Sequence, residues 1–275
     1  MTCEPPLARP AQFVRVAWRD LQRSPALAVE IAKRDIRKQY RQALFGPGAV
    51  VLTPLAMIGI ALGFHRTGIL NPEIGMASYP LYVAVGVILW MTFVDALNAP
   101  IHGLLADQRL LAQTRAPLEA IVLGKLGPLF LNVLIRAGVF VLVCIGAGVS
   151  LPASALFAPI GVLSLVVLGT SIGLLIAPIN VLYRDVSWMV STGTILWFVF
   201  SPVYFTAPPA GVVGAIMRLN PLTPILSDTR SLILTGSAGN LLPSLGVTLG
   251  ACLLLVVCWL YARVALWVTI EQGFE

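Results

Sequence analysis

The sequence carries little charge and few of the side chains that build catalytic or metal clusters. Only 11% of its 275 residues are charged, against about 25% in a typical soluble domain. It has two histidines and four cysteines, and no two cysteines have the CxxC spacing of a zinc or redox site. We therefore interpret Cys144, Cys252 and Cys258 as small buried apolar side chains, with neither a disulfide nor a metal site implied.

The motifs of several enzyme classes are missing as well. The sequence contains no HExxH, no GxSxG and no paired carboxylates for acid–base chemistry. Gly124 and Lys125 look like a fragment of the phosphate-binding motif GxxxxGK[ST], but Glu119 and Leu126 stand where the motif needs Gly and Ser or Thr. We expect a chain that is not an enzyme and binds no metal or cofactor. If ATP drives it, a separate ATPase must use the ATP and Mg.

Apolar residues, in contrast, are abundant. They make up 58% of the chain, and the mean hydropathy is +0.90. No soluble domain of ~100 residues can be cut from such a sequence, and its long apolar runs predict an all-α polytopic membrane protein. Six runs are interpreted as transmembrane helices: residues 46–64, 79–97, 121–149, 156–182, 186–205 and 241–266.

The segments around these runs complete the predicted organisation. Residues 1–45 form an N-terminal segment with an interfacial helix, residues 46–266 form the membrane domain, and residues 267–275 form a tail. Residues 206–240 are too apolar for a plain loop and too interrupted by proline for one span. We predict two short re-entrant half-helices there, because irregular backbone at membrane depth needs protein or a water-filled cavity around it.

The placement of Lys and Arg predicts the orientation in the membrane. Nine of the 18 Lys and Arg residues precede residue 42. With the N-terminus inside, fourteen of them lie in or beside inner segments, and only Arg66, Arg218 and Arg230 lie in outer ones. Because cytoplasmic loops carry the excess of Lys and Arg, we predict that both termini are cytoplasmic. The net charge of +6 is thus explained by orientation, and no nucleic-acid partner is expected.

The basic stretch of residues 24–44 is the most informative part of the chain. Ser24 can cap a helix, and Pro25 suits the first helical position. An ordinary surface helix of a soluble domain is the alternative, but the apolar run that follows disfavours it. The apolar residues recur at steps of three and four, which predicts an amphipathic helix on the membrane surface; they are Val29, Ala32, Ile36, Tyr40 and Leu44.

Charged residues inside the predicted spans are few. Asp95 is the only acidic one, and with His102 it forms either a proton relay or, the interpretation we favour, a polar pair at a helix end. Lys125 can extend toward the cytoplasmic headgroups. Arg136 lies near the middle of a span, where we expect it to hydrogen-bond to backbone carbonyls of the bundle.

An ordered set of motifs resembles a known family. Residues 34–42 and 44–47, followed by Pro54, resemble the opening of ABC-2 type permeases that export polysaccharides such as O-antigen, capsule and teichoic acid. Residues 86–90, 109–117, 183–186 and 220–224 resemble later motifs of the same family, in the same order.

This resemblance implies a half-transporter of the bacterial cytoplasmic membrane. Two copies of the chain, as a homodimer, would join two copies of a separate ATPase and carry a lipid-linked glycan outward through a lumen between the permeases. The alternatives are an ABC-2 exporter of a drug or lipid and, less favoured, an ATP-independent carrier or a membrane enzyme. The residues implied to meet the ATPase are Arg109, Leu110, Arg115, Tyr183, Arg184 and Asp185.

A lipid-linked glycan also suggests two sets of contacts. Its pyrophosphate needs cations, for which Arg34, Arg37, Lys38 and Arg41 are candidates, although attraction to anionic lipid explains them better. The apolar faces of its sugars stack on aromatic rings, and interfacial anchoring is an equal alternative for each ring. The candidate aromatics are Tyr79, Tyr82, Trp90, Phe93, Trp197, Phe200 and Tyr204.

Overall fold

The computed structural model describes residues 10–41, 48–67, 79–108, 110–111, 116–183, 185–205, 211–237 and 241–272. Every regular element within these ranges is helical. The helices are α1 (Pro10–Arg41), α2 (Gly48–Arg66), α3 (Tyr79–Ala106), α5 (Leu118–Gly146), η2 (Ala153–Phe157), α6 (Ala158–Leu182), α7 (Asp185–Val199), α8 (Gly211–Leu219), α9 (Leu222–Leu234) and α10 (Leu241–Gln272).

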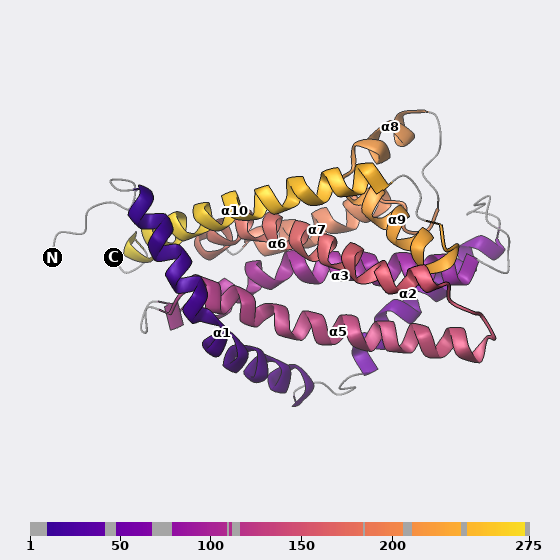
Figure 1. The fold of residues 1–275 in the computed structure, drawn as a ribbon, viewed down its shortest axis with the longest axis horizontal. Helices are drawn as coiled ribbons and strands as arrows, with labels where there is room; N and C mark the ends of the chain where they lie inside the picture. The colour runs from indigo at the N-terminus through magenta and orange to yellow at the C-terminus, as the bar shows by residue number, and fades with distance from the viewer. Residues whose placement is uncertain are drawn as a thin grey trace.

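Four segments are long and apolar enough to cross a membrane: Tyr79–Ala106, Leu118–Gly146, Ala153–Leu182 and Leu241–Leu266. They correspond to α3, α5, η2 with α6, and α10, and these helices run along the long axis of the molecule (Figure 1). α2 and α7 are apolar but shorter. The all-helical, membrane-type fold is confirmed at this level, whereas the count of six spans stays a prediction.

The centre of the bundle is the contact between α3 and α6. Gly169 and Gly173, one turn apart on α6, let the two backbones approach closely. A methyl group at Gly169 would lie 2.8 Å from the carbonyl oxygen of Phe93, and one at Gly173 would collide with that of Leu97. Small residues four apart allow close helix contact in lipid, where apolar side chains gain nothing by leaving the hydrocarbon.

Helix α1 begins well before Ser24, so the predicted start at Ser24 is wrong. Ser24 donates a 2.6 Å hydrogen bond from its hydroxyl to the carbonyl of Asp20, one turn back inside the same helix. Pro25 lies within α1 and has no N–H for the preceding turn. These two residues therefore mark a local defect, and α1 changes direction along its length (Figure 1).

The second half of α1 packs along α5 on a face next to the one predicted. Ala28 and Ile31 are buried, whereas Val29 of the predicted stripe is 50% exposed. A methyl group at Gly124 of α5 would lie 2.6 Å from Ile31, and one at Gly127 would lie 2.5 Å from Ala32. Small residues on α5 thus form the surface against which α1 packs.

Helix α3 also extends further than predicted. Its last residue is Ala106, beyond the predicted limit of residue 97, and Pro100 lies within the helix. Pro100 is fully packed beside Gly173, where an added methyl would lie 2.5 Å from Cγ of the proline. Packing against α6 thus outweighs the lost hydrogen bond. Pro117 then precedes α5 as its N-cap.

At the opposite end, α7 stops at Val199, earlier than the predicted limit of residue 205. Asn220 holds the turn that follows, since its side-chain amide donates to the carbonyl of Phe200 (3.0 Å) and to the hydroxyl of Ser201 (2.9 Å). Two short helices, α8 and α9, occupy the described part of the segment predicted to hold two half-helices. Their re-entry into the bilayer stays a prediction.

Candidate functional site

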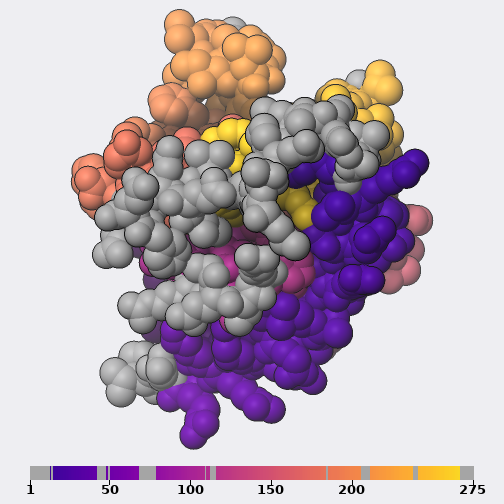
Figure 2. Space-filling model, turned by 90° about the vertical axis from the view of Figure 1, so that its left-hand side faces the viewer, coloured from indigo at the N-terminus to yellow at the C-terminus, as the bar shows by residue number. Residues whose placement is uncertain are grey.

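Several connections between helices gather at one end of the bundle. Near the end of α6, Asn180 donates to the carbonyl of Ile101 in α3 (3.1 Å) and accepts from the hydroxyl of Ser187 in α7 (2.7 Å). Arg263 of α10 donates to Glu119 at the start of α5 (2.7 Å). Seen from this end, α1 covers a large part of the molecule (Figure 2). The α6–α7 turn, the start of α5 and the last turns of α10 are thus all at the end that carries α1.

The predicted ATPase contacts fall at this same end where the structure describes them. Leu110 is partly buried and packs against an apolar cluster that includes Ile31 and Leu104. Tyr183 is 66% exposed, and Asp185 begins α7 with an exposed side chain. The other three, Arg109, Arg115 and Arg184, lie outside the described residues.

Four charged side chains form what we call the basal ion cluster, defined as Arg34, Asp35, Asp107 and Lys125. Arg34 donates to both carboxylate oxygens of Asp107, at 2.9 and 2.8 Å, and to Asp35 at 2.8 Å. The Lys125 ammonium bonds to Asp35 at 2.6 Å and to Asp107 at 2.7 Å. The cluster joins α1, α5 and the end of α3, and two cations face two carboxylates within it.

These contacts shift the titration of Asp107. Burial pushes its pKa up, but the hydrogen bonds from Arg34 and Lys125 outweigh burial, so the pKa of Asp107 lies below its ordinary value. The same carboxylate, followed by Asp35, raises the pKa of Arg34. The expectation that Lys125 extends to the headgroups is wrong, because the Lys125 side chain is 13% exposed and ion-paired on two sides.

The cations predicted for a lipid-linked substrate therefore differ from one another. Arg34 is engaged by two carboxylates, although its side chain is 47% exposed. Arg37, Lys38 and Arg41 are exposed on α1. The placement of these three leaves them available to an anionic group on the outer surface of α1.

A second ionic group ties α10 to α1 and α5 nearby. Arg263 donates to Asp20 of α1 and to Glu119, whose side chain is only 2% exposed. Trp259 donates from its indole N–H to the same Glu119 oxygen at 2.9 Å. The N-terminal helix is thus joined through ionic contacts to α3, α5 and α10.

Arg136 has a partner that the sequence interpretation did not assign. Its Nη1 donates to Oδ2 of Asp95 on α3 at 2.8 Å, and its side chain is only 4% exposed. Bonding of Arg136 to backbone carbonyls is therefore corrected to a pairing with Asp95. The predicted pair of Asp95 and His102 is therefore replaced by the pair of Asp95 and Arg136. The His102 side chain is exposed.

Five rings form an aromatic cluster between α3 and the end of α7, which we define as Trp90, Phe93, Trp197, Phe198 and Tyr204. Ring centroids lie 5.7 Å apart for Trp90 and Phe93, 5.2 Å for Phe93 and Trp197, and 4.9 Å for Phe198 and Tyr204. Trp90 and Phe93 are buried in the chain's own core. The Tyr204 hydroxyl donates to the Met57 carbonyl of α2 at 3.2 Å, which joins α2 to the cluster.

The other predicted aromatics have separate partners. Tyr79 is fully buried and donates to the carbonyl of Tyr204 at 3.1 Å. Tyr82 faces the guanidinium of Arg230, whose central carbon lies 3.7 Å from the ring centroid. Phe200 is 38% exposed, the most open of the seven. A channel-lining role for these residues stays a prediction, with Phe200 the best placed in the single chain.

Arg230, predicted only as a charge of an outer segment, is buried. It is 4% exposed and donates to the carbonyls of Pro202 (2.9 Å) and Val203 (3.2 Å). Gly86 makes room for it, because a methyl group there would collide with Arg230 and lie 2.6 Å from the Val203 carbonyl oxygen. Gly86 belongs to one of the family-like motifs, and this contact gives that motif a physical reason.

One signal could have identified the Arg136–Asp95 pair in advance. The two residues are opposite charges inside the second and third predicted spans, where an unpaired charge is unfavourable. No comparable local signal marks the basal ion cluster. Within the described ranges, no three His, Cys, Asp or Glu side chains come together as a metal site.

Comparison with known proteins gives a family and several relatives. A profile of the family described as "ABC-2 type transporter" matches residues 27–234. The chain is similar to the O-antigen export system permease protein RfbA of Klebsiella pneumoniae, with 22% identity over 212 residues that cover 76% of this chain and 81% of the relative. It is also similar to the protein of the same name from Myxococcus xanthus, at 21% identity over 78% of this chain and 82% of that protein.

Proposed function

Because the chain belongs to the ABC-2 type transporter family, we propose that it is the transmembrane permease of an ATP-driven exporter that moves a lipid-linked polysaccharide across the bacterial cytoplasmic membrane. The observation that carries the cargo assignment is the similarity to two O-antigen export permeases over more than three quarters of this chain. The four long apolar helices support a permease embedded in the membrane.

The exporter would contain two copies of this chain and two copies of a separate ATPase. The surface proposed to meet the ATPase is the end that carries α1, the α3–α5 connection and the α6–α7 turn. Exposed Tyr183 and Asp185 at that turn support this assignment. α2 and α7 would complete six spans, with both termini in the cytoplasm, and α8 and α9 would be the re-entrant half-helices.

Ionic contacts and a hydrogen bond connect this surface to several helices. A displacement of the α3–α5 connection would be transmitted to α1 through Asp107 and Arg34, and to α10 through Glu119 and Arg263. The α6–α7 turn reaches α3 through Asn180. Closure of the ATPase would therefore act on several helices together, since each contact joins different elements.

Arg37, Lys38 and Arg41 are the cations that we propose for attracting the lipid-linked phosphate, because they are exposed on α1. Phe200 and the partly buried Trp197 and Tyr204 are the aromatics that we propose for the sugar path. Anchoring to the membrane interface is the alternative role for all of these residues.

The test is reconstitution of the purified chain with its ATPase in vesicles that contain a lipid-linked glycan. We expect vanadate-sensitive ATP hydrolysis and ATP-dependent movement of the glycan to the far side of the membrane. Hydrolysis with movement of a drug or a simple lipid, but not of the glycan, would assign another cargo. Flux through the chain alone, with no ATPase, would contradict an ABC exporter of any kind.

A further inference from the structure

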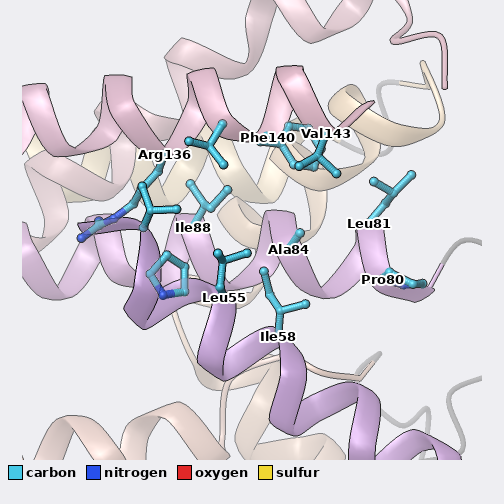
Figure 3. A pocket seen from close by; sticks show the side chains of 12 residues that line it. Leu55, Ile58, Pro80, Leu81, Ala84, Ile88, Arg136, Phe140 and Val143 are labelled. Carbon is cyan, nitrogen blue, oxygen red and sulfur yellow. The ribbon is translucent and has the colours of Figure 1, made fainter. Parts of the chain in front are cut away.

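Three of the cavities in the described structure differ in the charge that lines them. The cavity between α2, α3 and α5 is lined by apolar side chains and by Arg136, which is paired with Asp95 (Figure 3). The cavity between α3, α5 and α6 is lined by apolar side chains. The third, which we call the Asp228 cavity, has a volume of about 340 Å³ and is lined by twelve residues of η2, α6, α9 and α10. Its one charged lining residue, Asp228, has no ionic partner in the part of the chain that the structure describes.

The polar groups of the Asp228 cavity are mainly hydrogen-bond acceptors. Asp228 is half-buried and lines the cavity from α9, and its Oδ2 is buried without a hydrogen-bond partner among the described residues. Three lining hydroxyls use their hydrogens inside the protein. Ser164 and Ser244 donate to carbonyls of their own helices, both at 2.9 Å, and Thr248 donates to the Ser244 carbonyl at 2.7 Å. The lone pairs of these oxygens are therefore left to accept.

This lining is complementary to a cation that donates hydrogen bonds. A primary ammonium has three donors and no acceptor, and its bond to a carboxylate is strengthened by the opposite charges. None of the twelve lining residues is Lys, Arg or His, so the cavity holds no positive side chain of its own. For the same reason it offers no partner to a phosphate.

The cavity begins at the end of the bundle away from α1, where α6 and α10 start (Figure 1). Along α6 it extends from Phe157, just before the helix, to Ser164. Along α10 it extends from the first residue, Leu241, to Thr248. Seven residues of helix span about 10 Å. The cavity therefore leads from the helix ends about two turns into the bundle.

Asp228 lies near the beginning of this path. Its neighbour Thr229 packs against Gly161, the fourth residue of α6, where an added methyl group would collide with the Thr229 hydroxyl. The segment Ala153–Leu182 has 30 residues, or about 45 Å of helix, which is the thickness of a bilayer with its headgroups. The Asp228 carboxylate is thus close to the boundary between headgroups and acyl chains.

The open side of the cavity is apolar. Phe157, Ile160 and Leu245 line it and are 60%, 58% and 52% exposed. A sugar would be expected to stack on aromatic rings, and Phe157 is the one ring among the twelve lining residues. Hydrocarbon chains match this aliphatic surface better.

We propose that the Asp228 cavity binds a membrane phospholipid whose headgroup carries a primary ammonium, as in phosphatidylethanolamine. The ammonium donates to the Asp228 carboxylate from the cavity side and to the hydroxyl oxygens of Ser244 and Thr248, which are half-buried. The phosphate stays outside the cavity, and the acyl chains lie along the exposed apolar side chains. The volume is sufficient, since an apolar cavity of about 150 Å³ already holds benzene.

This lipid would join α9 to the long helices. Its ammonium neutralises a carboxylate of α9 while it bonds to hydroxyls of α10, so it bridges the two helices whichever cargo the protein carries. In the orientation proposed above, with both termini in the cytoplasm, the site lies in the outer leaflet. Only this choice of leaflet rests on the proposed function.

The test compares two exposed leucines of α10 that are one turn apart. Leu245 lines the cavity, whereas Leu249 is 72% exposed and is not among the lining residues. The full-length wild type, Leu245→Trp, Leu249→Trp and Asp228→Asn are purified in detergent and stripped of lipid. Each is titrated with phosphatidylethanolamine, phosphatidylcholine or phosphatidylglycerol of identical acyl chains. Native mass spectrometry counts the bound lipid, and the melting temperature reports its stabilising effect.

We expect the wild type and Leu249→Trp to bind one phosphatidylethanolamine per chain, and Leu245→Trp to bind it at least tenfold more weakly. Phosphatidylcholine should bind the wild type at least tenfold more weakly, because its trimethylammonium has no N–H, and phosphatidylglycerol should not compete. Equal binding by Leu245→Trp and wild type would overturn the site. Equal or tighter binding of either other lipid by the wild type would overturn the primary ammonium.

Asp228→Asn keeps the shape of the side chain and removes its charge, so it tests the carboxylate even if Leu245→Trp does not fold. We expect this variant to lose most of the preference for phosphatidylethanolamine over phosphatidylcholine. An unchanged preference would show that Asp228 does not hold the ammonium and would overturn the proposal.

Two further ligands identify the source of the ammonium. Glycerophosphoethanolamine, the same headgroup without acyl chains, should not raise the melting temperature, and protection by it would replace the lipid with a soluble amine. An O-antigen polysaccharide released from its lipid should not displace phosphatidylethanolamine, and displacement would assign the cavity to the cargo. Neither measurement needs the ATPase, so failure here leaves the proposed export function untouched, and failure of reconstituted export leaves this site untouched.

Discussion

Arg136 of α5 donates a 2.8 Å hydrogen bond to Asp95 of α3, and the two side chains are 4% and 29% exposed. They lie in two of the four helices long and apolar enough to span a membrane. An ion pair in this setting stabilises the bundle only while both partners remain, because removing one partner leaves an unpaired charge that is poorly solvated.

A double-mutant cycle on this pair should therefore show strong coupling. We expect Asp95→Asn to lower the free energy of unfolding by about 3 kcal/mol, as for other broken buried pairs. The double variant Asp95→Asn with Arg136→Gln should be less destabilised than the sum of the single changes. Melting in detergent gives the measurement, and Asp185→Asn, at an exposed acidic residue, is the control. Strict additivity would show that the two charges do not act as a pair.

The glycines of α5 allow a matched test of how α1 is seated. Gly124 faces Ile31 of α1, whereas Gly138 of the same helix has no atom within 4 Å of an added methyl group. Gly124→Ala should destabilise the α1–α5 contact by about 1–3 kcal/mol through overpacking and speed proteolysis of α1. Gly138→Ala should be neutral or slightly stabilising, because alanine is the better helix former. Similar effects of both changes would argue against close packing at Gly124.

These features also show which parts of the structure the sequence could predict. Hydrophobic runs predicted the positions of α5, α6 and α10 well, because a run of that length has few alternatives in a membrane. The proline signal failed at Pro25, which lies inside α1 and not at its start. The end of α3 was predicted too early, because Pro100 packs inside that helix against Gly173 of α6. A hydropathy profile contains no information about such packing.

The ionic contacts could not be predicted from neighbouring residues in the sequence, for a different reason. Arg34 and Asp107 are 73 residues apart in the sequence, and Asp35 and Lys125 are 90 apart. Nothing near any of the four indicates which opposite charge it will meet, since every basic residue of α1 looks equally available. The sequence could assign these side chains to one side of the membrane, and only the fold assigns their partners.

The basal ion cluster should depend on the charge of Asp107. Asp107→Asn removes the carboxylate that faces both Arg34 and Lys125. We expect the free energy of unfolding to fall by about 1–3 kcal/mol. The pKa of Asp107 lies below its ordinary value of 3.8, so its contribution is present above that pH and is lost as the pH falls through the lowered value. The acid side of the melting temperature against pH should therefore be shallower in the variant.

The control for Asp107→Asn is Glu30→Gln. Glu30 pairs with Lys33 on the surface of α1, where the two side chains are 70% and 57% exposed. An exposed pair contributes little, so the melting temperature should change by less than a degree or two. A loss as large as that of Asp107→Asn would mean that general surface charge, and not the cluster, stabilises α1.

The α6–α7 turn is the sharpest place to test the proposed coupling to an ATPase. Asp185 is exposed at the start of α7, so Asp185→Arg should leave folding and insertion unchanged. We expect the reconstituted exporter to hydrolyse ATP at near the normal rate while glycan transport falls at least tenfold. The ratio of transport to hydrolysis is the measured quantity. An unchanged ratio would remove this turn from the coupling surface.

The aromatic residues can be separated by their access to water. Phe200 is 38% exposed, whereas Phe93 is fully buried in the core of the chain. In a background without the four native cysteines, Phe200→Cys should react with a membrane-impermeant thiol reagent added from the outside, and Phe93→Cys should not. If Phe200 borders the sugar path, reaction at this site should slow when the glycan is bound, because the cargo would cover it. If Phe200→Cys stays unlabelled with and without ATP, the Phe200 ring lies against lipid. Reaction at Phe93→Cys would show that the aromatic cluster opens to water during transport.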